Sequence, residues 1–296
     1  SIKEISMSTF YNSERLKYNQ MNYNNDVELD NFCSQCLLVI NAVGPSFKIN
    51  DKIALHALRN NCHYIDIGGY GILRDLLKPY EKSIEAQKLC FIIGVGWMPG
   101  ISGVFSKTII ETHLNSPENT NFNIYYGAVD NWSYSSTYDL AASSMGKTRS
   151  YVYSHGKEIQ VSPFRYTHHK FFPFIGHKKI CMPSFDEQLT QLATSLKQIR
   201  KISTFIMLND YISMGKFMFI KIFYKHNLNK ATLMLQDDYQ RLVKKENKWG
   251  SVICQVSKIE PERKIDTFYY LYTKNNLLYT ALPAVITTQY LSLIHI

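Results

Sequence analysis

Residues 37–114 repeat one pattern: a short apolar run, a loop containing glycine, and then a segment with helical periodicity. The run at residues 37–42 is unbroken, residues 63–67 form a second short expected strand, and residues 89–93 form a third, apolar one. Unbroken apolar runs of this length are typical of strands buried on both faces, which are found in parallel sheets. Strands that alternate with helices at this spacing predict a Rossmann-like, doubly wound α/β fold, with a parallel sheet between two layers of helices.

The helical segments between these strands have recognisable ends. Asn50 or Asp51 can cap the first helix, which Asn60 terminates. Further helices are expected over residues 72–89 and 101–114, where apolar residues gather on one face. Because parallel strands deliver their carboxyl ends to one edge of the sheet, the loops that follow the strands are the candidate ligand site.

Three loops define this candidate site: residues 43–47, 67–71 and 94–100. Their glycines and prolines allow the backbone to approach a ligand closely, although the same residues also serve ordinary tight turns. A second domain must cover the loops, and residues 130–138 are expected to do so. We therefore predict that Gly44, Gly68 and Pro99 line one concavity, with Trp97 and Tyr138 on opposing walls.

The pattern changes at residue 122, where polar and apolar residues begin to alternate as in a half-buried strand. This change divides the chain into a partial nucleotide-binding domain (1–121), an α+β substrate domain (122–274) and a C-terminal helix that returns to the first domain (275–296). The elements expected after residue 122 are a helix at 135–145, strands at 150–153, 158–161, 203–208, 250–258 and 265–273, and helices at 185–199, 210–224 and 278–291.

Composition narrows the class of protein. The 296 residues are 45% hydrophobic and 19% charged, which allows a large core and excludes a disordered polymer. No apolar run reaches the length of a membrane span, and the first ten residues lack the features of a signal peptide. Six scattered cysteines are too few for a disulfide scaffold and favour a reducing, cytoplasmic setting. Cys33 and Cys36 form a CxxC motif, which either packs beside a strand or has a redox or metal role.

The charge is unevenly distributed. Residues 1–148 carry 12 Lys and Arg against 14 Asp and Glu, whereas residues 149–296 carry 21 against 10. A positive field of this kind favours an anionic ligand or a phosphorylated cofactor, although a solvated surface explains it equally. No nucleic-acid-binding module accompanies the basic stretches, so nucleic acid is not an expected partner.

The three strand ends carry a family resemblance. The segments NAVGPS at 41–46, HYIDIGG at 63–69 and GVGWMPGIS at 94–102 together resemble the saccharopine dehydrogenase (saccharopine reductase-like) family. Residues 125–141 and 279–291 resemble that family's substrate domain and returning helix. The resemblance implies a Rossmann domain, an α+β domain over the cleft, and nicotinamide-dependent reduction of an imine or carbonyl of a small metabolite.

The resemblance also implies a first strand and a glycine-rich phosphate-binding turn, and no GxGxxG motif stands near the start of this sequence. We therefore expect an N-terminally truncated form without its first βα unit, which by itself is inactive, and in which residues 4–10 form the second strand. After that strand, Ser8, Thr9, Ser13 and Arg15 favour NADP over NAD, although a solvated loop explains them equally. The C-terminal residues 291–296 read as non-native sequence.

The resemblance assigns the cofactor to the strand ends and the substrate to the cleft above them. The expected cofactor-binding residues are Asn41, Gly44, Pro45, Asp66, Gly68, Gly96 and Pro99. The expected substrate-binding residues are Trp97, Met98 and Trp132. True saccharopine reductases look acidic where Trp97, Met98 and Ser102 stand, so a larger or less charged imine or carbonyl substrate than saccharopine is expected; packing beneath the cleft is the other explanation for Trp97 and Met98.

Reduction of an imine or carbonyl needs a proton donor. Tyr138 and Asp130 are the candidates, against the simpler interpretations of a packed core hydroxyl and a helix cap. His168 and His169 are neighbours on an expected strand and point to opposite faces, so no metal site is expected. The first hypothesis is an NAD(P)-dependent reductase that acts on a small molecule and is able to form a homodimer. The alternative is a non-catalytic Rossmann-type binding or scaffold protein.

Overall fold

The computed structural model describes residues 16–69, 71–113, 117–146, 150–224 and 226–294. Its first sheet contains β1 (Leu38–Asn41), β2 (His63–Asp66) and β3 (Phe91–Ile93), paired in parallel in that order. Within the described residues, β1 forms an edge of this sheet. The expected strand over residues 4–10 lies outside the described residues.

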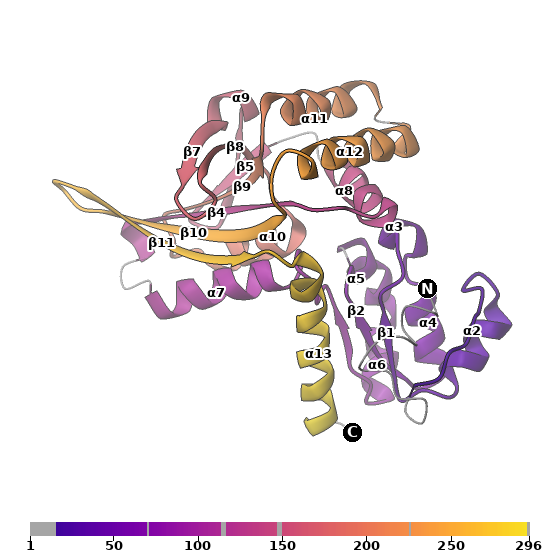
Figure 1. Ribbon diagram of the computed structural model, residues 1–296. Coiled ribbons are helices and arrows are strands. Elements are labelled where there is room, and N and C mark those ends of the chain that lie inside the picture. Colours follow the sequence, from indigo (N-terminus) through magenta and orange to yellow (C-terminus); the bar gives the residue numbers. More distant parts are fainter. Residues whose placement is uncertain (1–15, 70, 114–116, 147–149, 225, 295–296) are drawn as a thin grey trace.

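Helices lie on both faces of the first sheet (Figure 1). On one face, α2 (Asp26–Cys33), α4 (Lys52–Arg59) and α5 (Gly71–Leu77) pack on Val39 and Tyr64. On the other face, α13 (Asn276–Ile294) packs on Ile65 through Ala284 and Leu291. Tyr64 and Ile65, which are consecutive residues of β2, therefore pack in two separate cores, because successive side chains of a strand point to opposite faces.

The second sheet has eight strands, and six of them follow the order β11-β10-β4-β9-β5-β6. β4 and β9 pair in parallel at its centre, while β10 and β11 form a long antiparallel hairpin that extends away from the rest of the molecule (Figure 1). A hairpin of β7 and β8 joins through β9. The strands are β4 (Thr120–Val129), β5 (Ser150–Ser154), β6 (Lys157–Val161), β7 (His168–Phe172), β8 (His177–Pro183), β9 (Lys201–Leu208), β10 (Trp249–Ile259) and β11 (Lys264–Thr273).

The two faces of this sheet are covered differently. Phe122, Ile124 and Tyr126 of β4 enter a large apolar core that they share with the helices that cover this sheet. These helices are α7 (Ile101–His113), α8 (Tyr134–Gly146), α10 (Glu187–Ser195), α11 (Tyr211–Phe223) and α12 (Leu228–Val243). Tyr125, on the opposite face, packs with Phe172 of the β7–β8 hairpin.

The fold class is confirmed: a parallel sheet with helices on both faces is combined with a second, mixed sheet. Some local expectations were wrong. The helix expected at 72–89 is divided into α5 and α6 (Glu81–Ala86) by a 3-10 turn, Lys78–Tyr80, which contains Pro79. A proline has no backbone N–H and disfavours the α conformation of the residue before it. Asp51 stands at the N-cap of α4, but its side chain makes no capping hydrogen bond.

The CxxC motif is packed inside the first domain. Cys33 is fully buried at the end of α2, and the Cys62 thiol donates to the carbonyl oxygens of Cys33 and Cys36. Burial, followed by the neighbouring thiols, raises the pKa of Cys33 to about 12. A thiol in this environment stays protonated at neutral pH and is a poor nucleophile or metal ligand.

Candidate functional site

The loops that follow the strands of the first sheet lie against α8 and α10 of the second domain. The backbone N–H groups of Ser46 and Phe47, in α3 (Ser46–Ile49), donate to Asp139 of α8 at 2.9 and 3.2 Å. Gly100 N donates to Gln188 Oε1 of α10 at 2.9 Å. The carboxyl edge of the sheet therefore faces the second domain, which is where a doubly wound sheet binds its ligand.

Asn41 and Asp66, which were both expected to bind the cofactor, form a hydrogen bond with each other. They are register partners on β1 and β2, and Asn41 Nδ2 donates to Asp66 Oδ2 at 2.8 Å. Tyr64 Oη donates to the same oxygen at 2.6 Å, and Gly69 N donates to Asp66 Oδ1 at 2.5 Å. Asn41 Oδ1 accepts from Val43 N at 3.0 Å.

This network is buried, since Asn41 is 5% exposed and Asp66 is 2% exposed. Desolvation, followed by the charge of Asp66, raises the pKa of Tyr64 far above its ordinary value. The side chains of Asn41 and Asp66 therefore already have partners, and through the N–H groups of Val43 and Gly69 they hold the backbone of the two loops.

The glycines of the loops stand where a side chain does not fit. A Cβ atom on Gly44 would lie 2.8 Å from Ser135 Cβ of α8. A Cβ atom on Gly96 would lie 2.7 Å from the carbonyl oxygen of Ile67. Gly68 is closed in by Ser46. These glycines thus allow close packing of loop on loop and of loop on helix.

Tyr138 lies on α8 beside the first loop and is 8% exposed. Lys48 Nζ lies 4.5 Å from the centre of its ring and 5.7 Å from that of Tyr134. Among the described residues, the Tyr138 hydroxyl has no hydrogen-bond partner. It is therefore a polar group at the domain boundary that is free to bond to a ligand.

Asp130 follows β4 and has three partners. It accepts hydrogen bonds from Asn131 N at 2.7 Å and Asn276 Nδ2 at 3.0 Å, and it forms an ion pair with Lys248 at 2.9 Å. Burial alone would raise the pKa of Asp130, but the hydrogen bonds from Asn276 and Lys248 hold it below its ordinary value. The carboxylate is ionised at neutral pH and has no proton to donate. It ties the start of α13 to the end of β4.

The three expected substrate residues come together. Trp97, Met98 and Trp132 line a small cavity of about 50 Å³ at the carboxyl ends of β4 and β9. Trp132 stacks on Tyr239, and Trp97 packs edge-on against Tyr279 of α13. Such a volume holds one or two water molecules, whereas pockets for small metabolites usually measure roughly 300–1,000 Å³. The lining of this cavity does not include Gly44, Gly68, Pro99 or Tyr138.

Asp139 and Gln188 join the domains, and no sequence pattern predicts this role for them. Asp139 is 6% exposed, next to the Tyr138 that was singled out. Gln188 makes two hydrogen bonds to the third loop, because its Nε2 also donates to Gly100 O at 3.4 Å. Neither follows a motif, and both are recognisable only by what they contact in the fold.

Other expectations concern the cofactor, metals and membranes. The NADP-selecting residues Ser8, Thr9, Ser13 and Arg15 lie outside the described residues. In the part of the chain that the structure describes, no cluster of three or more His, Cys, Asp or Glu side chains is arranged to hold a metal ion. None of the helices described is both long enough and apolar enough to cross a membrane.

Comparisons with known proteins give a structural likeness only. No family model and no curated protein matches the sequence. An engineered D-amino acid dehydrogenase bound to NADP+ is 8% identical with a TM-score of 0.39, covering 91% of this chain and 76% of that one. The dehydrogenase MviM from Clostridium difficile is 8% identical with a TM-score of 0.36, covering 90% and 73%.

A third solved structure is yvaA from Bacillus subtilis, named as an oxidoreductase. It is 7% identical with a TM-score of 0.36, covering 90% of this chain and 73% of that one. None of the three is named as a saccharopine dehydrogenase, so that finer resemblance stays a prediction. At these scores the function has to be argued from the geometry of the site.

Proposed function

We propose that this chain belongs to an NAD(P)-dependent oxidoreductase that reduces an imine or carbonyl group of a small metabolite. The observation that carries this proposal is the unit β1–α4–β2–α5–β3, whose carboxyl edge faces α8. A βαβαβ unit of parallel strands is one mononucleotide-binding half of a Rossmann domain. The saccharopine dehydrogenase-like sequence of its three strand ends supports the same function.

In this proposal the nicotinamide lies over the backbone of the three loops, beside Gly44, Pro45, Gly68, Gly96 and Pro99. The cofactor supplies the hydride when it is bound. The Tyr138 hydroxyl donates the proton to the product. The Lys48 ammonium stabilises the negative charge that this step leaves on the Tyr138 oxygen. Trp97, Met98 and Trp132 form the apolar end of the substrate site.

The finer parts of the proposal follow the sequence. NADP is favoured over NAD, and the setting is cytoplasmic. Residues 1–121 bind the nucleotide, residues 122–274 bind the substrate, residues 275–296 brace the nucleotide domain, and two copies of the chain form a homodimer.

The test is binding of reduced nicotinamides to the purified chain, followed by nicotinamide fluorescence. NADPH, NADH and reduced nicotinamide mononucleotide are titrated separately, and hydrogen exchange locates the contact. Because the described strands form one mononucleotide-binding half, we expect the mononucleotide to bind about as well as NADPH. Protection is expected in residues 43–47, 67–69 and 94–100. If none of the three ligands binds at millimolar concentration while circular dichroism shows a folded chain, the proposal is wrong.

The role of Tyr138 is tested by variants. In the complete enzyme to which this chain is proposed to belong, Tyr138→Phe should lower hydride transfer to an imine or carbonyl acceptor without changing the affinity for the reduced nicotinamide. Tyr134→Phe is the matched control, because Tyr134 lies on the same helix and near the same lysine, while its hydroxyl bonds to Asn229 at 2.8 Å. Equal turnover in Tyr138→Phe and wild type would remove Tyr138 from the mechanism.

A second candidate function is a non-catalytic Rossmann-type binding or scaffold protein. The satisfied network of Asn41, Tyr64 and Asp66 favours it, as does the small volume of the apolar cavity. This candidate predicts protection of the same loops by a nucleotide without hydride transfer to any acceptor. Turnover that depends on Tyr138 would exclude it.

A further inference from the structure

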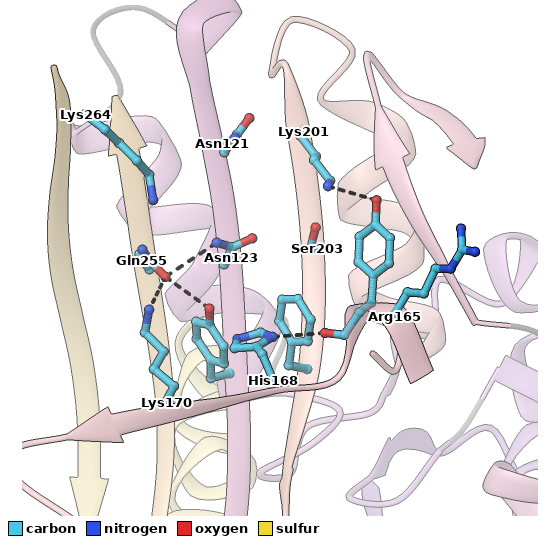
Figure 2. A pocket seen from close by; sticks show the side chains of 12 residues that line it. Asn121, Asn123, Arg165, His168, Lys170, Lys201, Ser203, Gln255 and Lys264 are labelled. Atoms are coloured by element: carbon cyan, nitrogen blue, oxygen red, sulfur yellow. Dashed lines mark hydrogen bonds between the residues drawn. The ribbon is translucent and has the colours of Figure 1, made fainter. Parts of the chain in front are cut away.

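A second, much larger cavity lies in the β-sheet domain, away from the first domain. Its volume is about 390 Å³, and it lies over β4, β9 and β10, with β7 and α9 (Pro163–Tyr166) along its side (Figure 2). Asn121, Asn123, Ser203 and Gln255 provide neutral polar groups on the sheet. A cavity of this size is in the range that binds small molecules.

The charged side chains around this cavity are all basic. Arg165, Lys170, Lys201 and Lys264 line it together with His168, and its lining contains no Asp or Glu. Lys264 pairs with Asp266 at 3.1 Å. Within the described residues, Arg165, Lys170 and Lys201 form no ion pair. Three of the four cations that line this cavity therefore lack a direct anionic partner among the described residues, although Asp266 acts on Lys170 from a distance.

Lys170 shows most clearly that the described lining of the cavity contains no anionic partner for its cations. Its ammonium group donates to the neutral Gln255 Oε1 at 2.8 Å and lies about 5 Å from the ring centres of Tyr125 and Phe268. Desolvation lowers the pKa of Lys170 from its ordinary value, and the charge of Asp266 offsets part of this effect. A partly buried cation whose direct contacts are all neutral is costly unless an anion completes its surroundings.

The amide groups of the cavity are partly unused. Gln255 Oε1 accepts from Asn123, Tyr125 and Lys170, so that oxygen is saturated. Asn121 Oδ1 is buried and has no hydrogen-bond partner among the described residues. A buried amide oxygen without a donor is uncommon in folded proteins and marks a place for a ligand or water donor.

The basic side chains form two groups. Lys170 and Lys264 come from β7 and β11 and lie on one side of Asn121 and Asn123, whereas Lys201 and Arg165 lie on the other side (Figure 2). Lys201 donates to Tyr166 Oη at 3.3 Å, which orients it along the cavity. Two separate cationic ends with amides between them suit a ligand that is anionic at both ends and has hydroxyl or carbonyl groups in between.

We propose that this cavity binds a small molecule that carries at least two phosphate or carboxylate groups. The site is separate from the proposed nicotinamide site. It shares no lining residue with the small apolar cavity at the proposed substrate site: Asn121, Asn123 and Tyr125 of β4 line this cavity, whereas the later residues 126–128 line the other. The ligand is therefore not the hydride acceptor, and binding at this site does not require that the proposed oxidoreductase function is correct.

Titration calorimetry at constant ionic strength tests this proposal with pyrophosphate, citrate and inorganic phosphate. We expect pyrophosphate or citrate to bind at least tenfold more tightly than phosphate, because only they present two or more anionic groups. The tighter of the two indicates whether phosphate or carboxylate is recognised. Equal affinity for all three probes, or no binding by the folded chain, would overturn the proposal.

Variants separate a built site from the general positive field of the domain. Lys170→Met and Lys201→Met should each weaken the binding of the tighter probe at least tenfold. Lys178→Met removes the same charge from an exposed position on β8 and should leave binding unchanged. Equal weakening by all three variants would mean that only the overall field attracts the anion. Circular dichroism and the melting temperature confirm that each variant is folded.

Discussion

Asp139→Ala tests how the two domains are joined at the candidate site. Asp139 reaches from α8 to the first turn of α3 and accepts from two backbone N–H groups, those of Ser46 and Phe47. The side chain is 6% exposed, so water cannot readily replace it. Because these N–H groups belong to the loop after β1, their loss loosens the loop that is proposed to hold the nicotinamide.

The magnitude follows from the two hydrogen bonds. A hydrogen bond to a charged group contributes roughly 1.5–3 kcal/mol, which gives about 3–6 kcal/mol for the pair. Removing the carboxylate also relieves its desolvation, which offsets part of this. We expect Asp139→Ala to lower the free energy of unfolding by about 2–4 kcal/mol. Asp139→Asn keeps one acceptor and should lose about half as much.

Urea unfolding followed by tryptophan fluorescence and circular dichroism measures this loss. Ser143→Ala is the matched control, because Ser143 lies exposed on the same helix and bonds only to Leu140 O. It should stay within about 0.5 kcal/mol of wild type. A loss of less than about 0.5 kcal/mol in Asp139→Ala, at an unchanged m-value, would refute the argument that this carboxylate joins the domains.

The pH dependence of the same variant has a definite sign. Burial is the largest influence on Asp139 and raises its pKa above the ordinary value, although the N–H groups of Ser46 and Phe47 act against it. The folded protein thus binds this proton more tightly than the unfolded chain does. The stability contributed by Asp139 therefore increases as the pH falls through the folded pKa, and the difference between wild type and Asp139→Ala should widen from pH 7 toward pH 4. A difference that narrows over this range would contradict the raised pKa.

Three further substitutions test the packing described above, each by urea unfolding. Gly44→Ala should cost about 1–3 kcal/mol through overlap with Ser135, and Ser135→Gly in the same chain should restore part of it; no restoration would mean that the strain lies elsewhere. Tyr64→Phe should cost about 1–3 kcal/mol, because a buried carboxylate loses a donor; a neutral effect would show that water replaces it. Burial alone would raise the pKa of Asp210, but Arg241 and the backbone hold it well below the ordinary value. Arg241→Met should therefore cost about 1–2 kcal/mol at pH 7, and this cost should shrink as the pH falls below about 4, whereas a constant cost would exclude the ion pair as its source.

Local patterns predicted much of the fold because burial in a sheet leaves a clear trace in the sequence. The run at residues 37–42 contains β1, and the stretch at 250–258 nearly coincides with the buried strand β10. The stretch at 265–273 nearly coincides with β11 although that strand is mostly exposed, because its aromatic residues favour a strand. The helix α12 was missed because its buried stripe includes polar residues. Thr232 and Asp238 lie on that stripe, and Asp238 is buried only because Arg241 and Lys216 pair with it. Such an ion pair forms only in the folded protein, and it places a polar residue on the buried face, where the helical pattern of apolar residues is then interrupted.

The position of the strand-end loops was predictable, but their contacts were not. The loops were recognised because glycine follows each of the three expected strands. The partners of Asn41 and Asp66 depend on the parallel register of β1 and β2, which no local pattern determines. Register sets these two side chains opposite each other, and they satisfy one another. Residue type at a strand end therefore indicates an ordered loop, and only the register shows whether the side chain is left for a ligand.

The residues of the basic cavity also could not be grouped from the sequence. The sequence showed that the positive charge lies in the second half, but Arg165, Lys170, Lys201 and Lys264 are spread over a hundred residues and follow no motif. Strand pairing brings them together, because β7 joins through β8 to β9, while β11 pairs with β10 beside β4. Repulsion among these like charges opposes folding unless solvent or a ligand compensates for it. A di- or polyanion that binds there should therefore raise the melting temperature of the wild-type chain more than that of Lys170→Met, because stabilisation by a ligand increases with its affinity and the variant is expected to bind the anion more weakly.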